Sequence, residues 1–407
     1  MPAELTQLLD PPAPAALAAP LAVIETHPVQ YHAPVYRRLQ SHHGVPVTAI
    51  YGSDFSVAGY RDREFAATFQ WDTDLLSGYS STFLRTVAAG AARTSDAVAA
   101  RGLHAAIRAA APGAILLTGY SPRFHRAACI AALRSRRPVI LRAETTDHTR
   151  PRAAAHSRIR DAALRLLYRS CSRLLYVGER SRDHFRRLGV PEGKLIFSPY
   201  CVDTSAFDCS EAVRPQLRRA ARAQLGIPAD ATVLLFSGKL SPRKAPDLLL
   251  QAVRMLAEKP AVVFLGSGEL QHTLQRAAAA SGINAHFPGF QNQTQLSPYY
   301  HAADLLVLPS LHSETWGLVV NEALHHGLPC VVSNAVGCAP DLIDPSVTGE
   351  IAVAGSADSL AAAIHRALAL INRPALREQC RQKVAAYSLE NGALGIAKAY
   401  RAVVARA

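Results

Sequence analysis

Residues 305–324 read LLVLPSLHSETWGLVVNEAL, a short apolar run followed by a polar loop and a second apolar stretch. The first run is too short for a helix and is typical of a buried parallel strand, whereas the sequence from about Trp316 onward has helical spacing. Strand, loop and helix in this order form the unit of a doubly wound sheet, in which ligands bind beyond the carboxyl ends of the strands. The loop around Glu314 is therefore a candidate site.

The same alternation continues along most of the chain. Short runs rich in Val, Ile and Leu occur at residues 21–26, 45–51, 114–118, 138–142, 173–177 and 194–198, and again at 232–236, 261–265, 283–287, 305–308 and 329–332. Longer segments with helical period lie between or after them, for example at 247–257 and 358–371. This pattern predicts an α/β protein with two Rossmann-like, doubly wound domains.

The domain boundary is expected where strand-like sequence stops near the middle of the chain. Apolar periodicity ends at residues 199–203 and does not resume at once. We predict a flexible tail over residues 1–20, a first domain over 21–199, a linker over 200–210 and a second domain over 211–387. Residues 388–407 carry an apolar stripe and are expected to form a helix that could cross back to the first domain.

The composition excludes several classes of protein. Apolar residues make up 49% of the chain and charged residues 18%, which favours a folded core over disorder. The seven cysteines are scattered without a C-x-x-C pair, so we expect free thiols in the cytoplasm rather than disulfides or a zinc site. The first 20 residues lack the features of a signal peptide, and we find no apolar run of about 18 residues that could span a membrane.

The positive charge is concentrated in the first half. Residues 1–200 contain 26 Lys and Arg against 15 Asp and Glu, whereas residues 201–407 contain 18 against 16. The densest stretch comprises Arg134, Arg136, Arg137, Arg150, Arg152, Arg158, Arg160, Arg165, Arg169 and Arg173. Such a stretch could contact an anionic membrane or a phosphorylated molecule, or could be a solvated helix face. No basic motif with interleaved aromatics accompanies it, so nucleic acid is not an expected partner.

Glu314 and Glu322 are two carboxylates on one loop and the helix after it. At a rise of 1.5 Å per residue they stand on the order of 10 Å apart, which roughly matches a sugar diphosphate. Carboxylates accept hydrogen bonds from hydroxyl pairs, and free amides at a helix start favour phosphate. The amides in question belong to Thr315, Trp316, Gly317 and Leu318. The alternative is a surface glutamate in a loop and a solvated glutamate on a helix, and spacing alone does not argue against it.

Cations follow an earlier strand. After residues 232–236 the chain reads SGKLSPRKAP, a glycine turn with Lys239, Arg243 and Lys244 close together. Positive charge at a strand end could neutralise a departing nucleoside diphosphate without a metal ion. A simple basic loop is the alternative.

With these motifs in order, the sequence resembles the retaining family-four glycosyltransferases of the GT-B fold. The resemblance is strongest over residues 230–350 and fainter over 21–203. It is carried by Glu314-x7-Glu322, G-K-L at 238–240 with Lys244, P-G-F at 288–290, A-D-L at 303–305, P-S at 309–310 and G-x-P-x-V-V-S at 327–333. Lys239 stands where most members have arginine, which keeps the charge but loses the planar fork.

The resemblance implies a retaining, metal-independent transfer of sugar from a UDP- or GDP-linked donor on the second domain to an acceptor on the first. No other cofactor is implied, and the acceptor could be a glycan, a glycolipid or a small metabolite. Glu314 would contact the donor sugar as a catalytic residue, and Glu322 would contact the ribose. Gly238, Lys239 and Lys244 would bind the diphosphate, and Phe290 would lie against the base.

Polar residues also follow strands of the first half. The family's glycine-rich phosphate loop is absent there, and the chain instead reads ETHPVQYHAP at residues 25–34. His27, Gln30 and His32 are candidates for the acceptor side. A histidine there could position or deprotonate an acceptor hydroxyl, and His27 is our catalytic candidate. A structural histidine beside a proline turn is the alternative.

Arg142 and Glu144 follow another strand at the same predicted edge. Glu144 is a further catalytic candidate, and Arg142 could bind acceptor or donor sugar. The two side chains could instead form an internal ion pair with each other.

Two further features of the first half carry weaker signals. Asp72-Thr73-Asp74 matches the D-x-D metal motif of the other major glycosyltransferase fold, but without a phosphate-type glycine loop no metal site is expected. The aromatic residues Trp71, Tyr51, Tyr60 and Tyr79 could form a wall on which sugar stacks, or could pack in the core.

Two other functions remain open from the sequence. A sugar-nucleotide epimerase has the same two-domain architecture, and a non-catalytic basic protein that binds surfaces fits the charge. For the transferase, we expect a cytoplasmic location that could include peripheral contact with the inner face of the membrane.

Overall fold

The computed structural model describes residues 19–62, 67–69, 71–86, 98, 100–121, 123–147 and 154–405. Residues 1–18 of the predicted tail lie outside this part of the chain, as do Arg150 and Arg152 of the basic stretch and the side chain of Tyr60.

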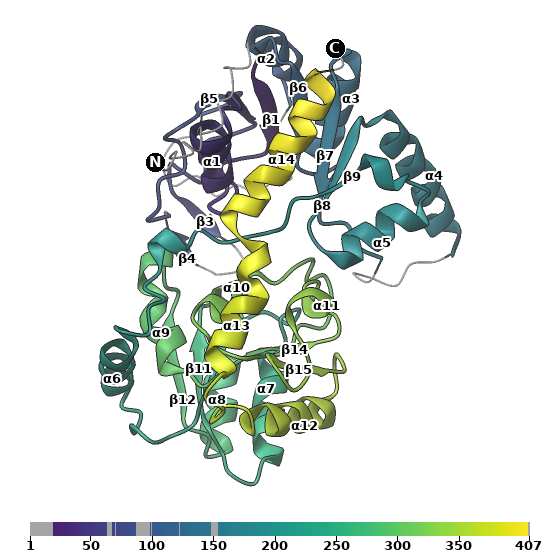
Figure 1. The fold of residues 1–407 in the computed structure, drawn as a ribbon. Coiled ribbons are helices and arrows are strands. Elements are labelled where there is room, and N and C mark those ends of the chain that lie inside the picture. Colours follow the sequence, from purple (N-terminus) through teal and green to yellow (C-terminus); the bar gives the residue numbers. More distant parts are fainter. Residues whose placement is uncertain are drawn as a thin grey trace, which may run out of the picture.

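Two parallel sheets form two domains, one above the other in Figure 1. The first sheet has the order β5(Ser80–Phe83), β2(Val47–Tyr51), β1(Leu21–Glu25), β6(Ala114–Leu117), β7(Val139–Ala143), β8(Arg173–Tyr176) and β9(Leu195–Phe197). The second has the order β12(Ala285–Gly289), β11(Ala261–Leu265), β10(Val233–Ser237), β13(Leu305–Leu308), β14(Cys330–Ser333) and β15(Gly349–Ala352). These two doubly wound sheets confirm the predicted fold class.

The central strands are apolar along their whole length because helices cover both faces of each sheet. In β10 every residue is buried, and Leu234 pairs with Val262 of β11 and with Leu305 of β13. Alternate residues of β10 enter different cores: Leu235 joins one hydrophobic cluster, and Leu234 joins the other. Continuous apolar runs therefore identified these strands correctly.

Helices cover the first sheet on two sides. On one side lie α1(Ala33–His43) and α14(Leu389–Val404), and on the other lie α2(Leu103–Ala110), α3(Arg123–Arg134), α4(Ala154–Ser170) and α5(Glu179–Arg187). Around the second sheet, α6(Arg214–Leu225), α9(Ser297–Ala302), α10(Leu318–His325), α11(Ala339–Leu342) and α13(Leu376–Val384) contribute to one core, and α7(Pro246–Met255), α8(Gln271–Ala280) and α12(Ala357–Leu368) to the other.

Helix α14 ends the chain on the first domain, where Figure 1 shows it running alongside α1. Ile396 and Tyr400 are fully buried in the core beneath it. Gly395 lies so close to the segment that leaves the first sheet that a Cβ there would be 2.1 Å from the Phe197 carbonyl oxygen. A small residue is therefore needed where α14 crosses the chain just before the second domain.

Some elements differ from the sequence expectations. The edge strands β5 and β15 were not predicted, because SSTF is polar and half-exposed and GEIA contains both Gly and Glu. The antiparallel pair β3(Tyr60–Asp62) and β4(Ala67–Phe69) was also missed. Helix α10 begins at Leu318 rather than near Trp316, because Gly317 has a left-handed φ of 101°.

Within the described ranges, no helix combines the length and the apolar character that crossing a bilayer requires.

Candidate functional site

Two adjoining cavities lie between the domains. The first, of about 320 Å³, is lined by the loops after β10 and β11, by α10 and by Gln30, Tyr31 and Trp71 of the first domain. The second, of about 310 Å³, is lined by residues 314–319 together with first-domain side chains. Tyr31, Lys244 and Val319 line both, so the cavities form one continuous cleft.

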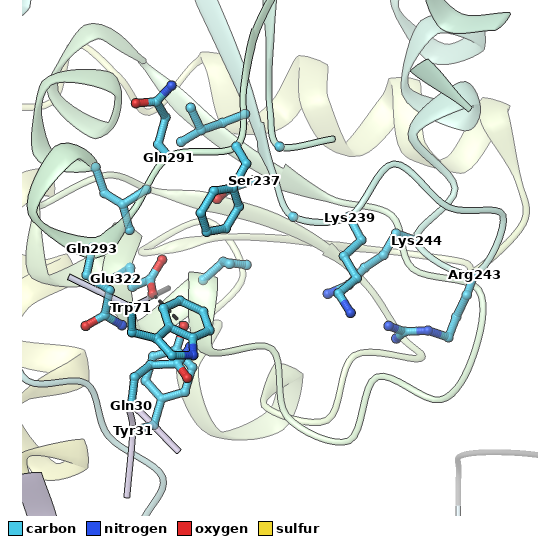
Figure 2. A pocket seen from close by; sticks show the side chains of 16 residues that line it. Gln30, Tyr31, Trp71, Ser237, Lys239, Arg243, Lys244, Gln291, Gln293 and Glu322 are labelled. Atoms are coloured by element: carbon cyan, nitrogen blue, oxygen red, sulfur yellow. Dashed lines mark hydrogen bonds between the residues drawn. The ribbon is translucent and has the colours of Figure 1, made fainter. Parts of the chain in front are cut away.

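Figure 2 shows the first cavity with its cations on one side and its carboxylate on the other. Lys239, Arg243 and Lys244 come from the loop between β10 and α7, and Glu322 comes from α10. The cavity therefore offers separate positive and acidic ends to one ligand.

Glu314 is held by cations in the second cavity. Its Oε2 atom is 2.5 Å from Lys244 Nζ and 3.4 Å from Arg243 Nη1, and Ser310 Oγ donates a hydrogen bond to it at 3.1 Å. Burial is the largest single influence and raises the pKa of Glu314, but the charge and hydrogen bond of Lys244, together with Arg243 and Ser310, outweigh burial and lower the pKa. Glu314 is therefore ionised at neutral pH and faces the cleft as a carboxylate.

The loop that carries Glu314 is fixed by a second loop beside it. The amide of Gly337 donates to the Glu314 carbonyl at 2.9 Å, and the amide of Cys338 donates to the Trp316 carbonyl at 2.9 Å. A Cβ on Gly337 would be 1.9 Å from the Thr315 carbonyl oxygen, so only glycine permits this approach. Gly317, Leu318 and Val319 at the start of α10 line the second cavity, and the first amides of a helix have no acceptors within the helix itself.

Glu322 is buried and has hydroxyl partners instead of cations. The Tyr300 hydroxyl donates to Oε2 at 2.6 Å, and the Tyr31 hydroxyl, from the first domain, donates to Oε1 at 3.2 Å. Burial raises the pKa of Glu322 to about 7 despite both hydrogen bonds. The carboxylate thus accepts from two hydroxyl groups, which is the pattern that a vicinal diol would offer.

Two glycine turns shape the floor of the first cavity. Gly238 follows β10 and Gly266 follows β11, and each has a φ of 140°. A Cβ on Gly266 would be 2.1 Å from the Gly238 carbonyl oxygen, so the turns touch backbone to backbone. The loop that bears Lys239 is consequently held close to the neighbouring strand end.

At the far end of the first cavity, one aromatic ring from each domain lines the wall, and the two rings contact each other. The ring of Trp71 lies edge-on to that of Phe290, with 6.3 Å between centroids. Asp72, next to Trp71, accepts hydrogen bonds from the Thr294 amide at 3.1 Å and the Thr294 hydroxyl at 2.5 Å. This contact, which sequence reasoning missed, fastens the Trp71 segment to the second domain.

The two aspartates of the D-x-D motif make separate contacts. Asp74 accepts from the amides of Leu76 and Ser77 and so stabilises a local turn, while Asp72 reaches the other domain. Among the residues whose placement is described, no group of three or more His, Cys, Asp or Glu could hold a metal ion.

The histidine candidates of the first domain have structural partners. His32 Nδ1 is 2.6 Å from Glu25 Oε1, and its ring stacks on Tyr200. His32 still lines the second cavity, and Gln30 lines the first. His27 packs against Phe55, with 4.4 Å between ring centroids, and burial lowers its pKa to about 4.

Arg142 and Glu144 have different environments. Arg142 is buried, donates to the carbonyls of Ser198 at 3.2 Å and Pro199 at 2.6 Å, and lies over the Tyr200 ring. Arg142 therefore fixes residues 198–200, where the chain passes from the first domain to the second. Glu144 lines the second cavity, and no ion pair between it and Arg142 occurs among the described residues.

A third cavity, of about 230 Å³, lies beyond Glu144 and was not foreseen from the sequence. It is lined mainly by polar groups at the ends of β6 and β7, including Thr118, Tyr120, Glu144 and Thr145, and also by Arg160 and Thr315. Glu144 and Thr315 line both this cavity and the second one. A hydroxylated molecule in the third cavity would therefore contact Thr315, the residue after Glu314.

Two family models match the chain. The model described as "Glycosyl transferases group 1" covers residues 218–386, and the one described as "Glycosyl transferase 4-like domain" covers residues 52–201. Among curated proteins, the D-inositol 3-phosphate glycosyltransferase of Mycobacterium leprae is 35% identical over 228 residues, which are 52% of this chain and 53% of the relative. The chain thus spans about half the length of the curated relatives it matches.

Solved structures show the same fold over nearly the whole chain. Sucrose-phosphate synthase of Thermosynechococcus elongatus has a TM-score of 0.72 at 19% identity, covering 96% of this chain and 100% of that one. HepE of Anabaena, solved in complex with UDP, has a TM-score of 0.69 at 16% identity, covering 94% and 100%. At these identities the likeness concerns the fold alone.

Proposed function

Because this chain belongs to the group 1 glycosyltransferases of the GT-B fold, we propose that it transfers a sugar from a nucleoside diphosphate donor to an acceptor. One observation carries the proposal: Glu322, the cations Lys239 and Lys244, and Glu314 follow one another along the cleft. This order suits a ribose diol, a diphosphate and a sugar.

The donor would lie along the wall formed by the second domain. Its base would pack near Phe290 and Trp71, and its diphosphate would contact Lys239, Lys244 and the amides at the start of α10. Glu314 would accept from the sugar hydroxyls while its charge is balanced by Lys244. UDP is the first nucleotide to test, because HepE, which shares the fold of this chain, was solved in complex with UDP.

The transfer would need no metal ion. Lys239, Arg243 and Lys244 supply positive charge where the diphosphate leaves, the task that a metal otherwise performs. We further propose retention at the anomeric carbon. The acceptor oxygen would bond to that carbon on the face from which the phosphate departs, and its proton would pass to the leaving phosphate oxygen.

The acceptor would bind from the first domain, in the third cavity between Glu144, Thr145 and Arg160. Hydroxyl, carboxylate and guanidinium groups at this place suit a polyol, and Arg160 could pair with an anionic substituent. The curated relatives are named for D-inositol 3-phosphate, which makes a phosphorylated polyol the first acceptor to test here. The free thiols of the seven cysteines fit a reducing, cytoplasmic setting.

A ligand screen followed by a product assay tests this function. UDP- and GDP-sugars that bind should raise the melting temperature in proportion to ln(1 + [L]/Kd). With a stabilising donor, we expect nucleoside diphosphate release only after a suitable acceptor is added. Conversion of the donor sugar without an acceptor would indicate an epimerase instead. Absence of binding by every nucleotide would contradict an enzyme of either kind.

A further inference from the structure

Helix α4 presents large apolar side chains to solvent. Ile159 and Leu166 are each 72% exposed, while Leu164 and Tyr168 of the same helix are buried in the first-domain core. Exposed isoleucine or leucine occurs singly on many surfaces, but two such residues at a spacing of seven lie on one side of a helix. The pair therefore forms a short apolar stripe.

A basic stripe runs beside the apolar one. Arg158, Arg165 and Arg169 are exposed, and at 100° per residue they point within about 40° of one another. Ile159 and Leu166 lie about a quarter turn away on the same helix. We call these five side chains the α4 face. Asp161, the one acid of the helix, is mostly buried and pairs with Arg187 and Arg160.

The arginines of the α4 face differ from those of the neighbouring helix. On α5, Arg182 and Arg186 pair with Glu192, and Arg187 pairs with Asp147 and Asp161. Within the described part of the chain, no ion pair involves an arginine of the α4 face. The charge of that face is therefore available to an external anion.

Helix α3 adds a second patch of the same character. Ile130 and Leu133 are 52% and 41% exposed, and Arg134, Arg136 and Arg137 beside them are also exposed. Both helices pack on the same core beneath the first sheet. Half of the eight most exposed large apolar side chains among the described residues lie on α3 and α4. Apolar exposure is thus concentrated where the positive charge is.

We propose that the α4 face, together with α3, docks this protein on the surface of an anionic lipid bilayer. A basic stripe next to an apolar stripe is the pattern of a helix that lies in the membrane interface, with arginines at the phosphates and aliphatic groups below them. Nucleic acid fits less well, because its backbone offers nothing to the exposed isoleucine and leucine and aromatic side chains are missing from the stripe.

The docking has a consequence for the acceptor, and this part rests on the proposed function. Arg160, next to Ile159 in sequence, lines the third cavity together with Glu144. The helix that contacts lipid therefore also borders the proposed acceptor site. Arg160 points to the opposite side of α4 from the arginine stripe, so we infer an amphiphilic acceptor whose hydroxylated head group would extend past α4 from the bilayer to the cavity.

Sedimentation with lipid vesicles tests the docking directly. We expect the protein to bind vesicles of phosphatidylcholine mixed with phosphatidylglycerol, to bind phosphatidylcholine alone at least about tenfold less, and to dissociate as salt increases. The triple variant Arg158→Glu/Arg165→Glu/Arg169→Glu should lose at least about tenfold in binding. Ile159→Ser/Leu166→Ser should also weaken binding, because the apolar stripe no longer inserts.

A matched triple variant serves as the control. Arg219→Glu/Arg254→Glu/Arg276→Glu changes the charge by the same amount on exposed positions of the second domain and should leave vesicle binding unchanged. Melting temperatures and far-UV circular dichroism equal to those of the wild type verify that all variants are folded. Equal binding to neutral vesicles, no binding to anionic ones, or equal losses in the control would overturn the proposal. The proposal would also be overturned if the protein bound a single-stranded oligonucleotide more tightly than anionic vesicles, and if Ile159→Ser/Leu166→Ser did not weaken that binding.

The vesicle assay contains neither donor nor acceptor, so its failure would leave the proposed transfer reaction untouched. The amphiphilic acceptor is tested separately. If docking delivers it, the triple α4 variant should lose turnover on a vesicle-borne acceptor while keeping turnover on its water-soluble head group. If the triple variant had equal turnover on the vesicle-borne acceptor and on its head group, the amphiphilic acceptor would be wrong, but the docking proposal would not be affected.

Discussion

The two walls of the cleft stand on the same kind of sheet, yet they use charge differently. On the second domain, Glu314 and Glu322 face cavities: a phosphate could take the place of Glu314 at Lys244, and a diol could take the place of the tyrosine hydroxyls at Glu322. On the first domain, Glu25 is tied to His32, and Arg142 is tied to backbone carbonyls that no ligand replaces. A charged side chain at a strand end can thus bind a ligand only where a group of the ligand can replace the protein group that the side chain contacts.

Among the variants that test this difference between the two walls, removal of the Glu314 carboxylate should have the largest effect on turnover. In Glu314→Ala we expect turnover to fall about 100- to 1,000-fold, because the donor sugar loses a hydrogen-bond partner and Lys244 loses its carboxylate. Turnover is measured as acceptor-dependent nucleotide release. UDP should bind the variant at least as well as the wild type, since the freed lysine can approach the phosphates. Near-normal turnover would contradict the role of Glu314.

The pKa of Glu322 makes donor binding depend on pH. The carboxyl is protonated below about pH 7 in the free protein because burial raises its pKa to about 7. Only the ionised form accepts from both ribose hydroxyls, so affinity should decrease as the pH falls. We expect a loss of about tenfold in UDP affinity between pH 8 and pH 6, relative to Glu322→Gln at each pH. This ratio removes the titration of UDP itself, and a ratio that does not change with pH would refute the ribose contact.

Trp71 tests whether the first domain contributes to the donor site at all. Its ring lies edge-on to that of Phe290 and lines the first cavity, so Trp71→Ala should weaken UDP binding about 3- to 10-fold through lost contact with the base. The chain has two tryptophans, and Trp316→Phe leaves Trp71 as the single reporter. Its fluorescence should change on UDP binding. An unchanged signal together with unchanged affinity in Trp71→Ala would restrict the donor site to the second domain.

The smallest effect is expected at His27. The ring is uncharged at neutral pH and packs on Phe55, and the leaving phosphate rather than this residue is proposed to take the acceptor proton. His27→Phe should keep the packing and change turnover by no more than about threefold. A loss of 100-fold or more with normal stability would show instead that His27 acts on the acceptor.

The positions of the second-domain candidates at the cleft were easier to predict than the long-range contacts of the first domain, for a physical reason. Glu314, Glu322 and Lys244 lie in loops and a helix directly after strands, and a parallel sheet brings such positions together whatever the rest of the chain does. The pair Tyr31 and Glu322 is separated by 291 residues and depends on how the domains meet, which no local pattern encodes. The contact of Asp72 with Thr294 is of the same kind.

The fold itself was predictable where strands are buried on both faces. Strand β10 is apolar throughout and was located to within one residue, whereas the edge strands β5 and β15 carry polar residues or glycine and were not found. His32 shows the corresponding limit for the site. Its position after β1 suggested an acceptor role, but its bond to buried Glu25 depends on tertiary packing.

The central claim is that the cations of the second domain bind the diphosphate of a nucleotide donor, and calorimetric titration of Lys244→Ala tests it most directly. Lys244 lines both cavities and lies between Glu314 and the first cavity. Relative to the wild type, we predict a 10- to 100-fold weaker Kd for UDP, about the value of a charge-assisted contact, and a Kd for uridine within about twofold. Equal weakening of both ligands, or of neither, would contradict the account.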